Sequence, residues 1–402
     1  MTTSRRRVVI TGMGAVSAAG LTAGAVIDRV LVGHSAMGPI SRFDAEQHSV
    51  RIAAEVPLPL DDGDDPLLRW GTGAAAGAVA SAGEPITDGE RAGVFVGTAL
   101  ASFAARERAG ALVHRDLVST LASAHGVRGP VLTLTSAFAA AADAIGIAAQ
   151  RIRSGDLDVA LAGGAESPVT PLVVAGFAAM GALSPSNDCP ETAIRPFDRD
   201  RNGCGLGEGA AFLVLEARER ALARGATILA ELAGYGTSAD ALHITQLPEN
   251  GEGLVRAMTS ALDDAGARPE DIGYINAHGT GTAMNDRIES RAIRHVFGPH
   301  ASRVGVSSTK PITGHLLGAA GAIEAVITIG AIRRGMLPPT ANWATRDPAC
   351  DLDYIPDGPR ESDLRLAMSN SMGFGGHNAV LVFRTHRYPR PCVPGDSPRA
   401  RR

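Results

Sequence analysis

The chain has 402 residues, of which 45% are hydrophobic and 20% charged, and its formal net charge at pH 7 is −4. This length and apolar content supply a substantial core and exclude an intrinsically disordered protein. The slightly negative charge provides no general attraction to nucleic acid or to an anionic membrane, so neither is expected as a partner. The sequence contains no run of the roughly 18 apolar residues that a membrane span needs.

The N-terminus superficially resembles a signal sequence, because Ser4 and three arginines precede the apolar run Val8–Ile10. That run is short, β-branched and followed by glycines, so we interpret it as a buried strand of a mature cytoplasmic protein. The four cysteines also fit a reducing compartment, because they are far apart and lack CxxC spacing. Neither a metal nor another cofactor is expected. The cysteines are Cys189, Cys204, Cys350 and Cys392.

Short β-branched or apolar runs alternate with alanine-rich helical stretches along the chain. This alternation predicts an α/β fold with a parallel or mixed sheet that is covered on both faces. Strands are predicted at Val8–Thr11, Gly93–Val96, Val131–Leu134, Val159–Ala162, Ala211–Leu215, Tyr274–Asn276, Val304–Ser307 and Ala379–Phe383. Helices are predicted at Ala139–Arg153, Gly253–Ala265, Arg287–Val296 and Gly318–Arg333.

Both halves of the chain carry a strand, a glycine-rich turn and an apolar helix, which indicates a duplicated core. The turn Pro248–Gly251 is the expected division. It separates an N-terminal half of residues 1–250 from a C-terminal half of residues 251–385. Residues 386–402 are rich in proline and arginine and are expected to form a flexible tail.

Four glycine-rich segments contain the residues with catalytic potential. Taken singly, each has an ordinary structural interpretation: a lone histidine after a strand is usually a core residue, and Gly-Phe-Gly-Gly is only a turn. The segments are Ile275–Thr282 with His278, Ser308–Gly321 with Lys310 and His315, Asn370–Asn378 as a tight turn before the last strand, and Arg195–Gly203 followed by Leu206–Ala210.

In this order and spacing, and with Val9–Gly14 at the start, the segments resemble the β-ketoacyl-acyl carrier protein synthases over roughly residues 5–385. These are the condensing enzymes of fatty acid and type II polyketide synthesis. The resemblance implies the thiolase fold, a five-layered αβαβα core of two similar halves that is normally dimeric. It also implies a cysteine at a helix start that takes the acyl chain. Two histidines would assist decarboxylation of malonyl carrier protein, and two backbone N–H groups would form an oxyanion hole.

The resemblance assigns roles residue by residue. His278 and His315 match the two family histidines, and Lys310 matches the lysine that orients the surroundings of the second histidine. Phe374 matches the turn phenylalanine whose N–H serves the oxyanion hole and whose ring gates the pocket. Two acidic positions after the first histidine motif resemble family residues with a structural role, namely Asp286 and Glu289.

The nucleophile position departs from the family pattern, which has a Thr-Ala-Cys-like turn before a small-residue helix. Here the segment runs from Thr135 to Gly146, and aligning its Ile145-Gly146 and the downstream Asp158–Glu166 run places Phe138 at the cysteine. A phenyl ring cannot form a thioester, so ordinary condensation is lost. The alanines that follow Phe138 are expected to make room for the larger ring.

Two further departures involve reactive residue types. Cys204 stands where the family usually has phenylalanine, near the expected pocket. It lies in a loop, where nothing lowers the pKa of a thiol, so a relocated nucleophile is the less favoured interpretation. His377 replaces the usual threonine after Gly-Phe-Gly-Gly and is interpreted as a local hydrogen-bonding substitution.

Within this family, a synthase-like subunit without the cysteine resembles the chain length factor of type II polyketide synthases. Such a factor forms a heterodimer with an active, cysteine-bearing ketosynthase and shapes the tunnel for a chain carried by acyl carrier protein. We predict this non-condensing role.

Whether the chain is itself an enzyme stays open. The alternative is a decarboxylase or priming synthase that acts on malonyl carrier protein through His278 and His315, because both histidines and Lys310 remain. The direction of the Phe138 ring decides between them. A ring beside the imidazoles closes the site, which we expect, whereas a ring turned towards Ala140–Ala142 leaves it open.

Overall fold

The computed structural model describes residues 5–386 except 62–63, 84–85, 87–88 and 110–115. The predicted tail therefore lies outside the described residues apart from His386. Within the described part of the chain, ten strands form one sheet in the order β10-β9-β13-β14-β8-β1-β7-β6-β4-β5. They are β1 (Val8–Ser17), β4 (Ala92–Gly97), β5 (Val131–Leu134), β6 (Val159–Glu166), β7 (Gly209–Ala217), β8 (Ala230–Ala239), β9 (Ile272–Asn276), β10 (Gly305–Ser307), β13 (Leu366–Gly373) and β14 (His377–Arg384).

The sheet consists of two copies of one strand arrangement. In the first copy, β1 is followed across the sheet by β7, β6, β4 and β5; in the second, β8 is followed by β14, β13, β9 and β10. Both copies thus place their first, fifth, fourth, second and third strands in that spatial order. β1 and β8 lie antiparallel to each other and join the copies. This repeat confirms the predicted duplication, and it groups β8, which precedes the turn Pro248–Gly251, with the second copy.

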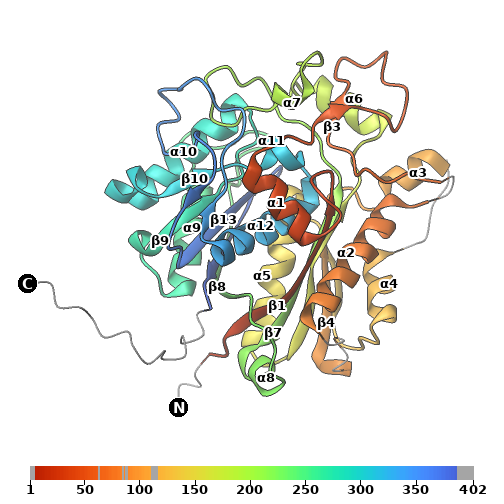
Figure 1. The fold of residues 1–402 in the computed structure, drawn as a ribbon, viewed down its shortest axis with the longest axis vertical. Coiled ribbons are helices and arrows are strands. Elements are labelled where there is room, and N and C mark those ends of the chain that lie inside the picture. The colour runs from red at the N-terminus through yellow and green to blue at the C-terminus, as the bar shows by residue number, and fades with distance from the viewer. Residues whose placement is uncertain (1–4, 62–63, 84–85, 87–88, 110–115, 387–402) are drawn as a thin grey trace, which may run out of the picture.

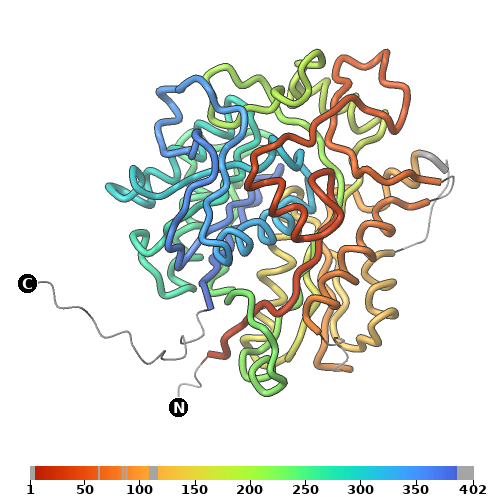
Figure 2. The backbone as a smooth tube through the Cα atoms, viewed as in Figure 1, coloured from red at the N-terminus to blue at the C-terminus, as the bar shows by residue number. Residues whose placement is uncertain are grey.

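The helices lie in three layers around the two halves of the sheet (Figures 1 and 2). α5 and α12 pack against each other in the middle, α2 and α4 cover the first half, and α9 and α10 cover the second. The succession is the predicted αβαβα core. The helices are α1 (Ala23–Val32), α2 (Pro66–Ala82), α3 (Phe103–Ala109), α4 (Leu117–Ala124), α5 (Ala140–Arg153), α6 (Pro171–Ala179), α7 (Pro190–Ala193), α8 (Arg218–Ala223), α9 (Glu252–Ala265), α10 (Ala283–Phe297), α11 (Lys310–Thr313) and α12 (Ala320–Arg334). Short strand pairs join β2 (Gly38–Pro39) to β3 (Ile52–Ala53) and β11 (Met336–Leu337) to β12 (Arg360–Glu361).

The middle layer is close-packed because its helices are built from small residues. Every residue of α12 from Ala320 to Ile332 is buried, so this helix has no solvent-facing stripe. A Cβ at Gly321 would lie 2.9 Å from the backbone nitrogen of Ala142 in α5. Glycine and alanine therefore let the two central helices approach each other closely.

The sequence patterns miss two strands of the ten-stranded sheet, β8 and β13. β8 contains Gly234 and Gly236, which read as turn residues, yet a Cβ at Gly236 would lie 2.2 Å from the carbonyl oxygen of Ala257 in α9. These glycines serve helix packing rather than a turn. β13 is rich in serine and asparagine, and its end was predicted to be part of the turn Asn370–Asn378. That prediction is wrong for Asn370–Gly373, which pair with β14.

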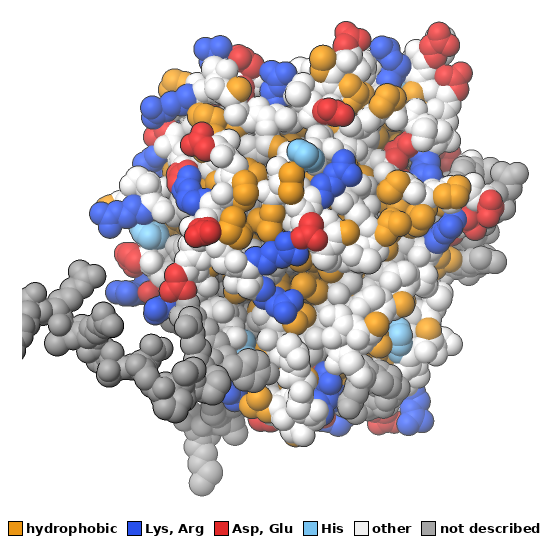
Figure 3. Space-filling view, viewed as in Figure 1, with side chains coloured by type: hydrophobic (Ala, Val, Ile, Leu, Met, Phe, Trp, Pro, Cys, Tyr) orange, Lys and Arg blue, Asp and Glu red, His pale blue; other side chains and the backbone are white. Residues whose placement is uncertain are grey.

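The arginines near the N-terminus are tied into the fold. Arg6 and Arg91 both pair with Asp158, and Arg7 pairs with Glu231 of β8. On the face shown in Figure 3, acidic and basic side chains are interspersed.

Over the described ranges, no helix combines the length and apolar character needed to cross a bilayer. Among these same residues, no group of three or more His, Cys, Asp or Glu side chains is arranged to hold a metal ion.

Candidate functional site

Phe138 lies on a sharp turn between a strand and the central helix α5. β5 ends at Leu134, and a short 3-10 turn, Ala137–Ala139, leads into α5. Ala137 has φ +49°, a left-handed conformation that residues with a Cβ adopt rarely and that is typical of functional turns. The turn directs the Phe138 side chain, which is 8% exposed, into a cavity between the two halves.

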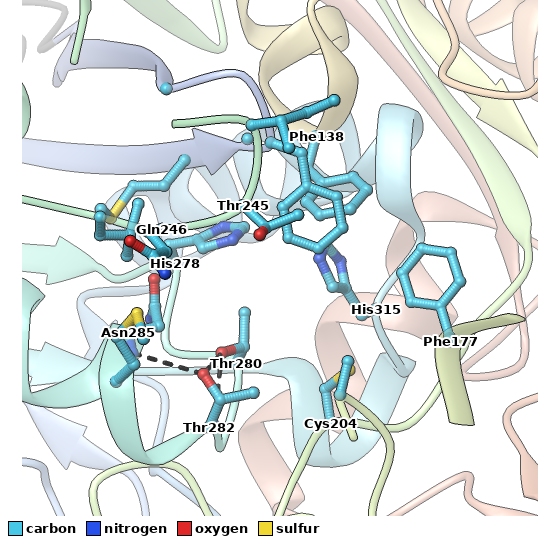
Figure 4. Close-up of a pocket in the computed structure, with 18 residues that line it drawn as sticks. Phe138, Phe177, Cys204, Thr245, Gln246, His278, Thr280, Thr282, Asn285 and His315 are labelled. Atoms are coloured by element: carbon cyan, nitrogen blue, oxygen red, sulfur yellow. Dashed lines mark hydrogen bonds between the residues drawn. The ribbon is translucent and has the colours of Figure 1, made fainter. Parts of the chain in front are cut away.

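The cavity measures about 110 Å³ and draws its walls from both halves of the chain (Figure 4). Its lining is predominantly apolar, with two imidazoles, five threonine, asparagine or glutamine side chains and one thiol at its polar points. The lining comprises Phe138, Phe177, Ala182, Cys204, Ile244, Thr245, Gln246, Leu247, His278, Thr280, Thr282, Met284, Asn285, His315, Met372, Gly373, Phe374 and Gly376.

The Phe138 ring occupies the space between an imidazole and a second phenyl ring. Its centroid is 4.9 Å from the His315 ring at an interplanar angle of 75°, and 4.8 Å from the Phe374 ring. Phe177 of α6 lies 6.2 Å from Phe138 and completes the aromatic cluster. The ring therefore lies beside His315, one of the two imidazoles.

The alanines after Phe138 do not make room for its ring, contrary to the prediction. Ala140–Ala142 are at most 1% exposed, and they pack against other backbone. A Cβ at Gly97 of β4 would lie 2.3 Å from the backbone nitrogen of Ala141. The small residues are needed because α5 lies close to β4 on one side and to α12 on another.

His278 and His315 face each other across the cavity, with ring centroids 5.2 Å apart. Behind them, Lys310 forms a buried ion pair with Glu324 of α12 and donates to the carbonyl oxygen of His278. Its Nζ also lies 3.4 Å from Nδ1 of His278. An ammonium only donates, so Nδ1 accepts and the neutral ring carries its proton on Nε2.

The environment keeps both imidazoles neutral. Burial, followed by the nearby positive charge of Lys310, holds the pKa of His278 and that of His315 well below 6.5. Neither ring nitrogen of His315 has a hydrogen-bond partner among the residues that the structure describes. A neutral imidazole with a free N–H is a suitable donor to a carbonyl oxygen that gains negative charge.

Two backbone N–H groups converge near the aromatic cluster. Gly373 packs against the turn, since a Cβ there would lie 2.9 Å from the backbone nitrogen of Phe138. Neither the N–H of Phe138 nor that of Phe374 donates to an acceptor within the described ranges. Backbone donors without an acceptor are the kind of group that an oxyanion hole would use.

The remaining candidate residues are not arranged as donors or nucleophiles for this chemistry. Cys204 lines the cavity, but burial raises the pKa of its thiol to about 12, which disfavours the thiolate that a nucleophile needs. His377 is exposed at the start of β14 and does not line the cavity. Glu289 accepts the N–H groups of His278 and Gly279, each at 2.8 Å. Asp286 accepts the N–H groups of Phe197 and Gly281.

Sequence reasoning missed Phe177 and the segment Ile244–Leu247 that forms part of the cavity wall. Phe177 lies in the uniformly apolar helix α6, whose sequence carries no chemical signal. Ile244 is 70% exposed, and its carbonyl oxygen accepts the N–H of Gly375 next to Phe374. Only a pairing between the β8–α9 connection and the Gly-Phe-Gly-Gly turn brings this segment to the site.

We expect His278 and His315 to contribute a loss of stability when the pH drops below the ordinary histidine pKa. Buried carboxyls whose pKa is raised to about 7, namely Glu166, Glu208 and Glu324, contribute in the opposite direction. The unfolded chain protonates His278 and His315 near pH 6.5, whereas their lowered pKa keeps them neutral when folded. Their stabilising contribution is complete above pH 6.5 and is lost as the pH falls. Between pH 7.5 and 5.5 each histidine should contribute a loss of at most roughly 1.4 kcal/mol to the free energy of unfolding. Urea titrations across this range measure it. The carboxyl contributions are common to both proteins, so relative to the wild type His315→Asn should gain stability as the pH falls from 7.5 to 5.5. An unchanged pH dependence would contradict the assignment.

Family models match both halves of the chain. The model described as "Beta-ketoacyl synthase, N-terminal domain" matches residues 5–221, and the one described as "Beta-ketoacyl synthase, C-terminal domain" matches residues 229–344. The 3-oxoacyl-[acyl-carrier-protein] synthase 2 of Staphylococcus aureus strain N315 is 41% identical, with 94% of this chain and 98% of the relative covered. The protein of the same name from Synechocystis is 40% identical, with 95% and 99% covered.

Solved structures agree with this assignment. A type II PKS acyl carrier protein in complex with its ketosynthase, bound to the hexaketide, matches with TM-score 0.89 and 34% identity, covering 95% of this chain and all of the other. The ishigamide ketosynthase/chain length factor matches with TM-score 0.86 and 37% identity, covering 96% of this chain and all of the other. With family models over both halves and full-length relatives above 30% identity, this chain belongs to the β-ketoacyl synthase family.

Proposed function

We propose that this chain is a non-condensing, ketosynthase-like subunit of the chain length factor kind. In this role it pairs with a cysteine-bearing ketosynthase and shapes the tunnel for an acyl chain held by acyl carrier protein. The observation that carries the proposal is Phe138. Its ring occupies the turn at the start of α5, 4.9 Å from His315, where a condensing enzyme needs a thiol.

Cys204, Thr280 and Thr282 of the cavity do not replace the missing thiol. Cys204 is buried with its pKa raised to about 12, so it stays protonated at neutral pH. The hydroxyls of Thr280 and Thr282 bond to each other at 2.9 Å, and Thr282 also caps α10. A hydroxyl becomes a nucleophile only beside a general base, and neither bonds to an imidazole in the described residues.

The similar structures support the classes of partner. One of them is a ketosynthase in complex with its acyl carrier protein, and another is a ketosynthase/chain length factor. Both resemble this chain over nearly its whole length. The curated relatives, in contrast, are 3-oxoacyl synthases. Despite that similarity, Phe138 leaves this chain without the thiol that condensation needs.

A second candidate function is decarboxylation of malonyl carrier protein, favoured by the intact pair of neutral imidazoles. Decarboxylation needs no enzyme thioester, only donors for the thioester carbonyl while carbon dioxide leaves. His278 and His315 are placed to donate, but the Phe138 ring lies in the approach to His315. We therefore rank this activity below the structural role.

Co-expression with a cysteine-bearing ketosynthase from the same organism, the cognate synthase of the proposal, tests it. We expect a 1:1 complex by native mass spectrometry, because a catalytically empty subunit of this fold should bury its apolar dimer face against an active homologue. The 3-oxoacyl synthase 2 of Staphylococcus aureus serves as a non-cognate control that should stay separate. A stable homodimer that ignores the cognate synthase would contradict the proposal.

A further inference from the structure

The C-terminal half contains a second turn with the same backbone as the one at Phe138. Here a 3-10 turn, Leu317–Ala319, leads into α12, the counterpart of α5. Leu317 has φ +42°, beside +49° for Ala137. The next-but-one residues also match, with φ −91° and ψ −5° at Ala319 and φ −91° and ψ −7° at Ala139. Gly318 is therefore the counterpart of Phe138.

The residues that face the two turns are also counterparts. β6 and β13 are the fourth strands of the two copies, each has eight residues, and their last residues are Glu166 and Gly373. Gly373 lies against the N–H of Phe138, and Glu166 accepts the N–H of Gly318 at 3.0 Å. In each case the facing residue comes from the opposite half.

The loops after β4 and β9 complete the correspondence. Ala99 is the second residue after β4, and His278 is the second residue after β9. His278 lines the cavity at Phe138, while a Cβ at Gly318 would lie 2.2 Å from the backbone nitrogen of Ala99. The second turn therefore has glycine and alanine where the first has Phe138 and His278.

Glu166 is buried in the second turn and accepts four hydrogen bonds there. The residue is 0% exposed, and its Oε2 accepts the N–H groups of Ala99 at 2.6 Å and Gly318 at 3.0 Å. Its Oε1 accepts the N–H of Leu100 and the hydroxyl of Thr98. Within the described residues no cation pairs with it. Burial raises the pKa of Glu166 to about 7, and these four hydrogen bonds oppose that rise.

We infer that Glu166 is an internal anion that occupies a second, degenerate copy of the oxyanion site. Of the two equivalent turns before α5 and α12, only the N-terminal one opens to a ligand. Gly373 leaves the N–H of Phe138 free, whereas Glu166 accepts the N–H of Gly318. Glu166 is thereby a positioning residue. It fixes the start of α12, which carries Glu324, and it fixes Leu317, which packs in the same hydrophobic cluster as Phe138.

Rescue by a small carboxylate tests this inference on the full chain at pH 8. Glu166→Ala should lower the melting temperature by roughly 5–10 °C, because four buried donors lose their acceptor. Sodium formate should recover at least half of that loss, whereas sodium chloride at equal ionic strength should not. Glu166→Gln is the matched control. Its amide group would face two N–H donors, so it should lose similar stability, and formate should not restore it because the side chain still fills the site.

The outcomes separate an anion site from simple packing. The inference is supported if formate raises the melting temperature of Glu166→Ala but not that of the wild type or of Glu166→Gln. Equal effects of formate and chloride would overturn it, as would a Glu166→Gln variant as stable as the wild type. If the alanine variant does not fold in chloride, its refolding yield in formate is measured instead. No gain in that yield would count equally against the inference.

Discussion

Phe138→Cys is expected to convert a chain that takes up no acyl group into one that is acylated once per molecule. The substitution places a thiol at the N-terminus of the central helix α5, where the helix dipole stabilises a thiolate. The N–H groups of Phe374 and of the new cysteine would receive the oxyanion, since neither has a protein acceptor within the described residues. Intact mass after incubation with an acyl carrier protein thioester measures the adduct.

Two variants locate the adduct and control for opening of the pocket. Phe138→Ala removes the ring without adding a thiol and should remain unmodified. Phe138→Cys combined with Cys204→Ala should be acylated as fully as the single variant, because the thiol of Cys204 stays protonated. An adduct that requires Cys204, or a cysteine variant that stays unmodified although folded, would show that the turn is not poised for acyl transfer.

Phe138→Ala should release carbon dioxide from malonyl carrier protein well above the rate of the wild-type chain. The ring lies 4.9 Å from His315, so its removal enlarges the cavity where the substrate carbonyl approaches two neutral donor imidazoles. Losing one such donor costs a factor of roughly 10²–10³ in rate. Phe138→Ala combined with His315→Ala should therefore fall back by about that factor. The assay follows labelled carbon dioxide from the isolated chain.

The wild-type chain and the variants give distinct outcomes in this assay. Turnover by the wild type that disappears in His315→Ala would show that the ring does not close the site and would favour the decarboxylase function. An alanine variant at background would show that the imidazoles lack the geometry for the reaction. Either result would leave the absence of condensation unaffected, because that depends on the missing thiol.

Much of the fold follows from local patterns, and the two missed strands show where such patterns fail. β1 and β7 read as strands because their apolar runs are buried on both faces. β8 and β13 were missed because their glycine, serine and asparagine residues serve contacts with α9 and α10 rather than turns. Asn370 of β13, for example, donates to Glu289 at 3.2 Å. Long-range packing overrides local propensity at such positions.

For the candidate site, sequence motifs identify which residues meet but not how they meet. The resemblance of these motifs to the β-ketoacyl synthases predicts one site that contains His278, His315, Lys310, Phe138 and Phe374. The structure brings these residues to one cavity or its rear wall. The direction of the Phe138 ring depends on α5, α6 and the Gly-Phe-Gly-Gly turn at once, so no single segment determines it. The same holds for the lowered histidine pKa, which results from burial.

The most direct test of the central claim is the intact mass of the wild-type chain after incubation, by itself, with an acyl carrier protein thioester. The account predicts an unmodified mass, because a phenyl ring occupies the nucleophile position and Cys204 is held as a buried thiol. A stable acyl adduct on the wild-type chain would contradict the claim. Peptide mapping of that adduct to Cys204 would establish a relocated nucleophile in place of a non-condensing subunit.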